Sequence, residues 1–79
     1  MPFVYLLKCA DGTLYTGWTT NLERRLGEHN AGRGARYTRA RRPVTLAYSE
    51  QVADRSAALR REAEIRRLRR SDKLELIRR

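Results

Sequence analysis

The chain has 79 residues, a formal net charge of +9 and one cysteine, Cys9. Its length predicts a single domain (residues 1–79) that buries only roughly 60% of its unfolded surface. A lone cysteine without a Cys/His cluster excludes a disulfide framework and a structural zinc site. No apolar run is long enough for a signal sequence or a membrane span, so we expect a soluble, cytoplasmic protein without a membrane partner.

The positive charge comes almost entirely from arginine, because Lys8 and Lys73 are the only lysines among 18 basic residues. A GC-rich genome would produce the same bias without any functional meaning. A field of this strength on so small a protein nevertheless attracts polyanions, and the guanidinium group matches phosphate geometry. The charge therefore favours a nucleic-acid partner.

Two strands are predicted at the start of the chain, over residues 3–9 and 13–18, with a turn at Asp11-Gly12. A two-residue loop would place Tyr5 and Tyr15 on opposite faces of the hairpin. A three-residue loop, Ala10-Asp11-Gly12, would place Tyr5 opposite Gly17 and both tyrosines on one face. We favour the three-residue loop, whose last residue must be left-handed, as Gly12 permits.

A helix is predicted next, over residues 21–30, where Thr20-x-x-Glu23 forms a capping box. Leu22 and Leu26 lie on one side of this helix, with Arg25 and His29 on or beside the same side. A loop over residues 31–43 and a strand over Val44–Ser49 follow.

Asp54 or Ser56 can cap a second helix that continues to about Arg70, and Ser71-Asp72 predicts the start of a short C-terminal helix. The resulting order, β-β-α-β-α-α, predicts an α+β fold in which helices flank one three-stranded antiparallel sheet.

Glu62 is an acidic residue within the apolar stripe of the second predicted helix, between Ala58 and Ile65 on one side and Leu59 on the other. A carboxylate in such a position needs compensation. One interpretation is an i,i+4 ion pair with Arg66 at the rim of the stripe. The other is a divalent cation, because magnesium or manganese often takes a single protein carboxylate together with water and phosphate.

The remaining candidates for chemistry also have ordinary interpretations. Strand tyrosines are common, and a phenol is a weak base at neutral pH unless a cation stabilises its ionised form. Tyr5 would need Arg25 or a metal ion for that purpose. His29, the only histidine, often has a simpler role at a helix end, where it interacts with the dipole.

The ordered set of motifs nevertheless resembles the GIY-YIG nuclease superfamily, and more closely its small stand-alone bacterial members. The set comprises Val4-Tyr5-Leu6, Tyr15-Thr16-Gly17, Arg25-x-x-x-His29 and Glu62. The resemblance spans essentially the whole chain. The first triplet keeps only the tyrosine of the family pattern, and the second keeps the tyrosine and the glycine.

This resemblance implies a GIY-YIG endonuclease-like fold and hydrolysis of phosphodiester bonds with a single Mg²⁺ or Mn²⁺ ion. By the resemblance, Tyr5, Tyr15, Arg25 and His29 occupy the catalytic positions, and Glu62 is the metal ligand. Arg25 would stabilise the developing charge and Tyr5 would activate or position the attacking water. Tyr15 and His29 would orient the nucleophile.

We expect DNA to be the substrate, selected by its structure rather than its sequence. The DNA-binding residues are predicted in the basic loop: Arg36, Tyr37, Arg39, Arg41 and Arg42. The alternatives are a non-catalytic nucleic-acid-binding module and a subunit that supplies this domain to a protein partner that directs it.

Overall fold

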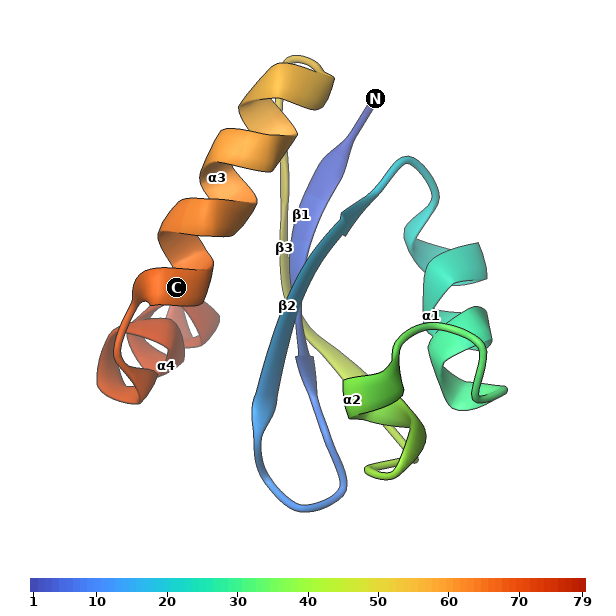
Figure 1. Cartoon of the computed structure of the whole chain (residues 1–79). Helices are drawn as coiled ribbons and strands as arrows, with labels where there is room; N and C mark the ends of the chain where they lie inside the picture. The colour runs from blue at the N-terminus through green and yellow to red at the C-terminus, as the bar shows by residue number, and fades with distance from the viewer.

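Three antiparallel strands form one sheet in the computed structural model, which describes residues 1–79. The strands are β1 (Phe3–Lys8), β2 (Leu14–Thr19) and β3 (Thr45–Gln51), in the order β2-β1-β3. Figure 1 shows α1 (Leu22–Asn30) and α2 (Arg36–Arg39) on one side of the sheet, and α3 (Arg55–Arg67) and α4 (Arg70–Arg78) on the other. The predicted α+β fold, with helices flanking a three-stranded antiparallel sheet, is confirmed.

The hairpin has the register of the three-residue loop, as predicted. Tyr5 lies opposite Gly17 and Leu7 lies opposite Tyr15. Gly12 has a φ of 86°, and its N–H donates to the Cys9 carbonyl at 2.9 Å. A left-handed last residue closes the turn with strands of matching twist. Both tyrosines therefore face the side of the sheet that α1 covers.

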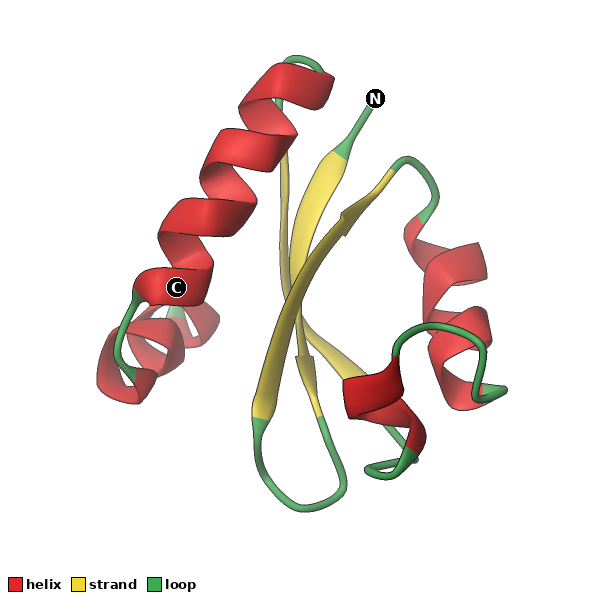
Figure 2. Ribbon diagram, viewed as in Figure 1, coloured by secondary structure: helices red, strands yellow, loops and turns green.

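One helix was missed, because α2 lies inside the segment predicted as a loop over residues 31–43 (Figure 2). A helix of four residues has no room for an apolar repeat, so its sequence carries no periodic signal. Its Thr38 is fully buried. Contacts made within the folded chain, rather than helix propensity, hold this turn.

Several predicted boundaries were wrong by a few residues. Asn21, not Thr20, caps α1: its side chain accepts the Arg24 N–H at 3.0 Å. The cap of α3 is Asp54, one of the two residues predicted for it, and its side chain accepts the Ala57 N–H at 2.8 Å. This helix ends at Arg67, not at about Arg70. Neighbouring polar residues can cap a helix equally well, so tertiary contacts decide between them.

The last two elements also begin or end away from the predicted positions. The third strand covers Thr45–Gln51 rather than Val44–Ser49. The last helix begins after Arg69, which makes no side-chain cap, so the predicted start at Ser71-Asp72 lies within its first turn. An acidic residue there, Asp72, still interacts favourably with the helix dipole.

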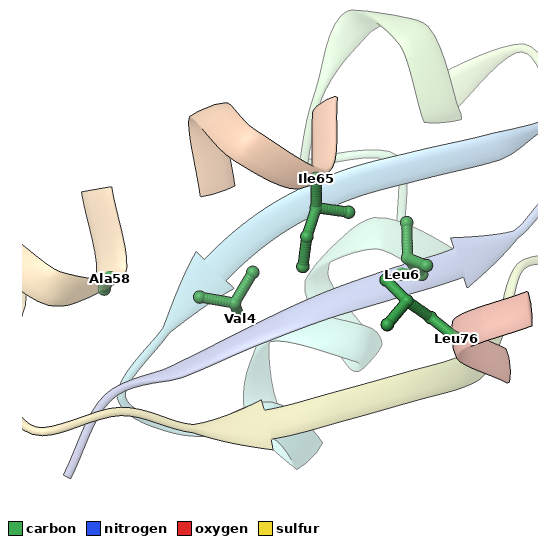
Figure 3. Packing of buried hydrophobic residues seen from close by; sticks show 5 residues of the cluster. All are labelled: Val4, Leu6, Ala58, Ile65 and Leu76. Carbon is green, nitrogen blue, oxygen red and sulfur yellow. The ribbon is translucent and has the colours of Figure 1, made fainter. Parts of the chain in front are cut away.

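Alternation along β1 divides the core into two layers. Val4 and Leu6 point toward α3 and α4 and pack with Ala58, Ile65 and Leu76 (Figure 3). Tyr5 and Leu7 of the same strand belong to a second cluster, with Cys9 and Val44, on the side of the sheet that α1 covers. Both faces of the central strand are buried, which explains its nearly continuous apolar sequence. No helix is both long and apolar enough to cross a membrane.

Replacement of Ile65 by alanine should lower the free energy of unfolding by about 3 kcal/mol, because the fully buried side chain would leave a cavity between α3 and the sheet. Leu59 on the same helix is 46% exposed, and its replacement by alanine should cost less than about 1 kcal/mol. Urea denaturation followed by circular dichroism measures both values. Equal losses would contradict the packing assigned to α3.

Candidate active site

The site begins with Tyr5, at the centre of β1 and only 2% exposed. Its ring crosses the backbone of Gly17 on the neighbouring strand, where a Cβ atom would collide with the phenol oxygen and ring. Only glycine leaves room for this crossing. The ring thereby extends from the central strand toward β2, whose far edge has no neighbouring strand.

His29 lies near the C-terminal end of α1 and is fully buried. Its Nε2 atom lies 3.0 Å from the Tyr5 oxygen, and its Nδ1 atom lies 2.8 Å from Oγ1 of Thr38 on α2. The Thr38 hydroxyl donates to the Ala35 carbonyl at 3.1 Å. Gly34 allows the loop to pass against the imidazole, because a Cβ atom there would collide with the ring. Both ring nitrogens are therefore hydrogen-bonded inside the protein.

Tyr15 joins this group from β2. Its ring meets His29 edge-on, with centroids 5.3 Å apart, and stacks with Tyr37 at 5.8 Å. The Arg41 guanidinium lies over the Tyr37 ring, 4.0 Å from its centroid. Aromatic and cation–π contacts thus connect the predicted catalytic tyrosines and histidine to the basic loop.

Arg25, on α1, lies at the border between this buried group and solvent, with its side chain 32% exposed. It donates to Glu28 at 3.0 Å and to the Gly34 carbonyl at 2.9 Å. Burial alone would lower the pKa of Arg25, but Glu28 and Tyr5 outweigh it and raise the pKa. The guanidinium is therefore permanently charged, and its other N–H groups remain available to an anion.

Both groups of the central hydrogen bond are neutral at neutral pH. Burial raises the pKa of Tyr5, and Arg25 opposes that effect in part. Burial, followed by the charge of Arg25, lowers the pKa of His29. Desolvation disfavours the phenolate and the imidazolium alike, so the pair holds one transferable proton without carrying a net charge.

Glu62 approaches from the other side of the sheet, on α3. Its side chain is 18% exposed, and its Oε1 atom lies 3.4 Å from Arg66, so the expected i,i+4 ion pair is present. Its charge nevertheless contributes to raising the pKa of Tyr5. The helix packs against β2, the strand that the Tyr5 ring crosses, so a charge on α3 can act on the phenol from the opposite layer.

No group of three or more His, Cys, Asp or Glu side chains is arranged to hold a metal ion. A single carboxylate is still compatible with Mg²⁺ or Mn²⁺, which take hard oxygen ligands and complete their shells with water and phosphate. Glu62 offers such a donor, half-buried and next to one exposed arginine. The residues present therefore fit a single ion that is shared with a phosphate substrate.

The residues of the predicted DNA-binding loop fall into two groups, according to whether their side chains are hydrogen-bonded within the protein. Arg36, Tyr37 and Arg39 are exposed. Arg41 donates to Asp11 at 3.1 Å and to the Tyr37 carbonyl at 2.8 Å. Arg42 donates to the Arg39 carbonyl at 2.8 Å. The two last arginines brace the loop, which leaves the guanidinium groups of Arg36 and Arg39 free at its surface.

A second basic surface lies along β2, and its Lys73 was not among the residues predicted to contact a substrate. Two adjoining hollows lie along β2 and share Leu14 and Lys73. One is completed by Thr13 and Arg70, and the other by Tyr15, Thr16, Tyr37 and Arg66. We call these hollows the β2-edge groove. The i, i+4, i+7 spacing of Arg66, Arg70 and Lys73 was the available signal, but a change of helix direction interrupts it.

Comparison with known proteins identifies the family of this chain. The sequence profile of the GIY-YIG catalytic domain matches residues 1–75. The chain therefore belongs to the GIY-YIG family, which is a nuclease superfamily. The resemblance inferred from the motifs is confirmed.

The relatives are small proteins of similar length. A UPF0213 protein of Syntrophus aciditrophicus (strain SB) is 55% identical over 76 residues, which cover 95% of this chain and 87% of the relative. A solution NMR structure of a UPF0213 protein from Bacillus halodurans is 41% identical and superposes with a TM-score of 0.61, covering 98% of this chain and 83% of that chain. The solution NMR structure of an E. faecalis protein, which is 42% identical, superposes with a TM-score of 0.63 and covers 96% of this chain and 81% of that chain.

The lowered pKa of His29 predicts that acid will destabilise the fold. The unfolded chain, with a histidine pKa near 6.5, binds a proton at higher pH than the folded chain. This contribution to stability is complete above that pH and decreases as the pH falls toward the folded-state pKa. Urea unfolding at about pH 7.5 and about pH 5.5 measures the loss.

His29→Gln should show a smaller loss over the same interval, whatever its absolute stability. The comparison is clean because the chain has no other histidine to titrate there. A pH slope shared by both proteins would show that the folded-state environment of His29 is not what the buried geometry implies.

Proposed function

We propose that this protein is a divalent-metal-dependent endonuclease that hydrolyses phosphodiester bonds in DNA. The observation that carries the proposal is the buried Tyr5–His29 hydrogen bond, which lies beside Arg25 and within electrostatic reach of Glu62. Family membership supports a nucleic-acid substrate. The arrangement provides an acceptor for the proton of water, a fixed cation and a carboxylate.

Each residue has a distinct proposed role. Tyr5 positions the attacking water and accepts its proton, while His29 orients the phenol. Tyr15 packs edge-on against the imidazole and restricts its position. Arg25 binds the phosphate with the N–H groups that Glu28 and Gly34 leave free, and stabilises the added negative charge.

Glu62 would hold the Mg²⁺ or Mn²⁺ ion. When bound, such an ion supplies Lewis-acid neutralisation of charge on the scissile phosphate. The ion pair with Arg66 is easily exchanged, because the Arg66 side chain is 61% exposed and gains little from one surface contact.

The substrate path that we propose follows the β2-edge groove. Arg70 and Lys73 have no carboxylate partner within salt-bridge distance, so their charges are available to phosphate. The groove passes Tyr15 and reaches Tyr37, where the loop with Arg36, Arg39, Arg41 and Arg42 continues the basic surface. Contacts of this type position a backbone without reading bases, which favours selection by DNA structure.

Incubation of the purified protein with branched or single-stranded DNA and Mn²⁺ or Mg²⁺ should give cleavage that EDTA abolishes. Arg25→Ala and Glu62→Ala should each reduce the rate by at least about 100-fold, because each removes stabilisation of the transition state. Arg60→Ala is the matched control: Arg60 is exposed and bonds only to Ser56, so the rate should not change.

Equal cleavage by all four proteins would reveal a contaminating nuclease. Binding without cleavage, over several metals and DNA structures, would instead assign a non-catalytic nucleic-acid-binding module. In that case a partner protein that is co-purified and restores cleavage would identify the domain as a subunit directed by that partner.

Arg70→Ala and Lys73→Ala should each weaken DNA binding in EDTA and reduce the slope of log K against log salt by about one. Arg78→Ala removes the same charge from the same helix, but Arg78 does not line the groove and pairs with Glu75. Its salt slope should match that of the wild type. Fluorescence anisotropy with a labelled oligonucleotide measures all four proteins, and three equal slopes among the variants would remove the groove from the substrate path.

A further inference from the structure

The hydrogen bonds around His29 have a defined direction. A threonine hydroxyl carries one hydrogen, and that of Thr38 is donated to the Ala35 carbonyl at 3.1 Å. Toward the imidazole, Thr38 can then only accept, so the hydrogen of that 2.8 Å contact belongs to Nδ1 of His29. In a neutral imidazole the other nitrogen, Nε2, is an acceptor. The hydrogen of the 3.0 Å contact therefore belongs to the Tyr5 phenol.

This direction determines what Tyr5 offers to a substrate. Its hydrogen points into the protein at His29, so toward any other partner its oxygen can only accept a hydrogen bond. An attacking water molecule would therefore donate a hydrogen bond to Tyr5, which leaves the lone pair of the water free to bond to phosphorus. A phenol that donated its hydrogen outward would instead occupy that lone pair.

We propose that Thr38 is a positioning residue: its hydroxyl holds His29 in the Nδ1–H tautomer, so that Nε2 receives the Tyr5 proton when Tyr5 accepts a proton from the attacking water. This inference rests on the proposed nuclease function. Thr38 is fully buried on α2, a helix of four residues that is adjacent to α1, so it acts through His29 and has no surface to offer a substrate.

The proton balance is complete within these groups. The water oxygen forms a bond to phosphorus as one of its protons moves to the Tyr5 oxygen, and the phenol proton moves to Nε2. The P–O bond to the leaving oxygen breaks, and that oxygen keeps the electron pair. His29 is then an imidazolium whose Nδ1–H still donates to Thr38, and it returns the proton through Tyr5 to solvent or to the leaving group.

The surroundings of the imidazole favour a neutral ring before the reaction. The charged groups near it are Arg25 and Glu28 on its own helix, of which Arg25 opposes and Glu28 favours protonation. Tyr5 from β1, Tyr15 from β2 and Thr38 from α2 complete its contacts. The rest of its surface is buried, so no water competes for either nitrogen.

The tautomer can be measured directly, because His29 is the only histidine in the chain. Long-range ¹H–¹⁵N correlation spectra of the protein at neutral pH should show a protonated Nδ1 and an unprotonated Nε2. Thr38→Ser keeps the hydroxyl and should keep this pattern. Thr38→Val has the same shape without an acceptor, and it should convert a large fraction of His29 to the Nε2–H form.

Cleavage provides the second readout. Thr38→Val should lower kcat by about 100-fold with little change in KM, whereas Thr38→Ser should remain within a few-fold of the wild type. A predominant Nε2–H tautomer in the wild type would overturn the proposal, as would a Thr38→Val variant with the altered tautomer and an unchanged kcat.

Folding and activity are separated by the design. If Thr38→Val does not fold, the wild-type and Thr38→Ser spectra still decide the tautomer. If the tautomer is as expected but no DNA is cleaved under any condition, the nuclease proposal fails while the role of Thr38 in orienting His29 stands.

Discussion

The Tyr5–His29 hydrogen bond joins the central strand to the C-terminal end of α1 and lies at the middle of the second core layer. Burial of a phenol and an imidazole is unfavourable unless each polar atom finds a partner, and the Thr38 hydroxyl completes the set. The neighbouring structure adapts to this requirement. Gly17 and Gly34 leave space for the two rings, and α2 places the hydroxyl under the imidazole.

Charge is the second constraint on this molecule. Only Arg25, Arg41, Arg61, Arg66 and Arg78 have carboxylate partners, although the chain carries 18 basic residues. Unpaired like charges on a small fold repel each other and are relieved by a polyanion. The same arginines therefore oppose the compact fold by mutual repulsion and would favour the proposed nucleic-acid binding, so we expect salt to affect both.

The edge position of β2 connects the two layers of the protein. Because no strand pairs with the outer edge of β2, groups from the α1 layer and from α3 can approach each other past its backbone. Tyr5 extends toward that edge across Gly17, and the charge of Glu62 acts on its phenol from the other face of the sheet. A covered edge would leave the catalytic candidates in two separate layers.

Sequence alone determined whatever depends on neighbouring residues. Alternation in β1, the left-handed Gly12 and the spacing of Arg25 and His29 predicted the sheet, the register and one face of α1, because strand and helix periods place side chains directly. Local capping signals gave boundaries only to within a few residues, since several polar residues compete for each helix start. The motif spacing also indicated the family.

Tertiary structure alone decided the rest. Local patterns do not show that Thr38 lies against His29, that Arg41 and Arg42 donate to carbonyls of their own loop, or that Lys73 and Tyr15 line one groove. These contacts join elements far apart in the chain, and no local period records them. A buried hydroxyl and a surface hydroxyl have the same letter in a sequence, and only the packing of the finished fold distinguishes them.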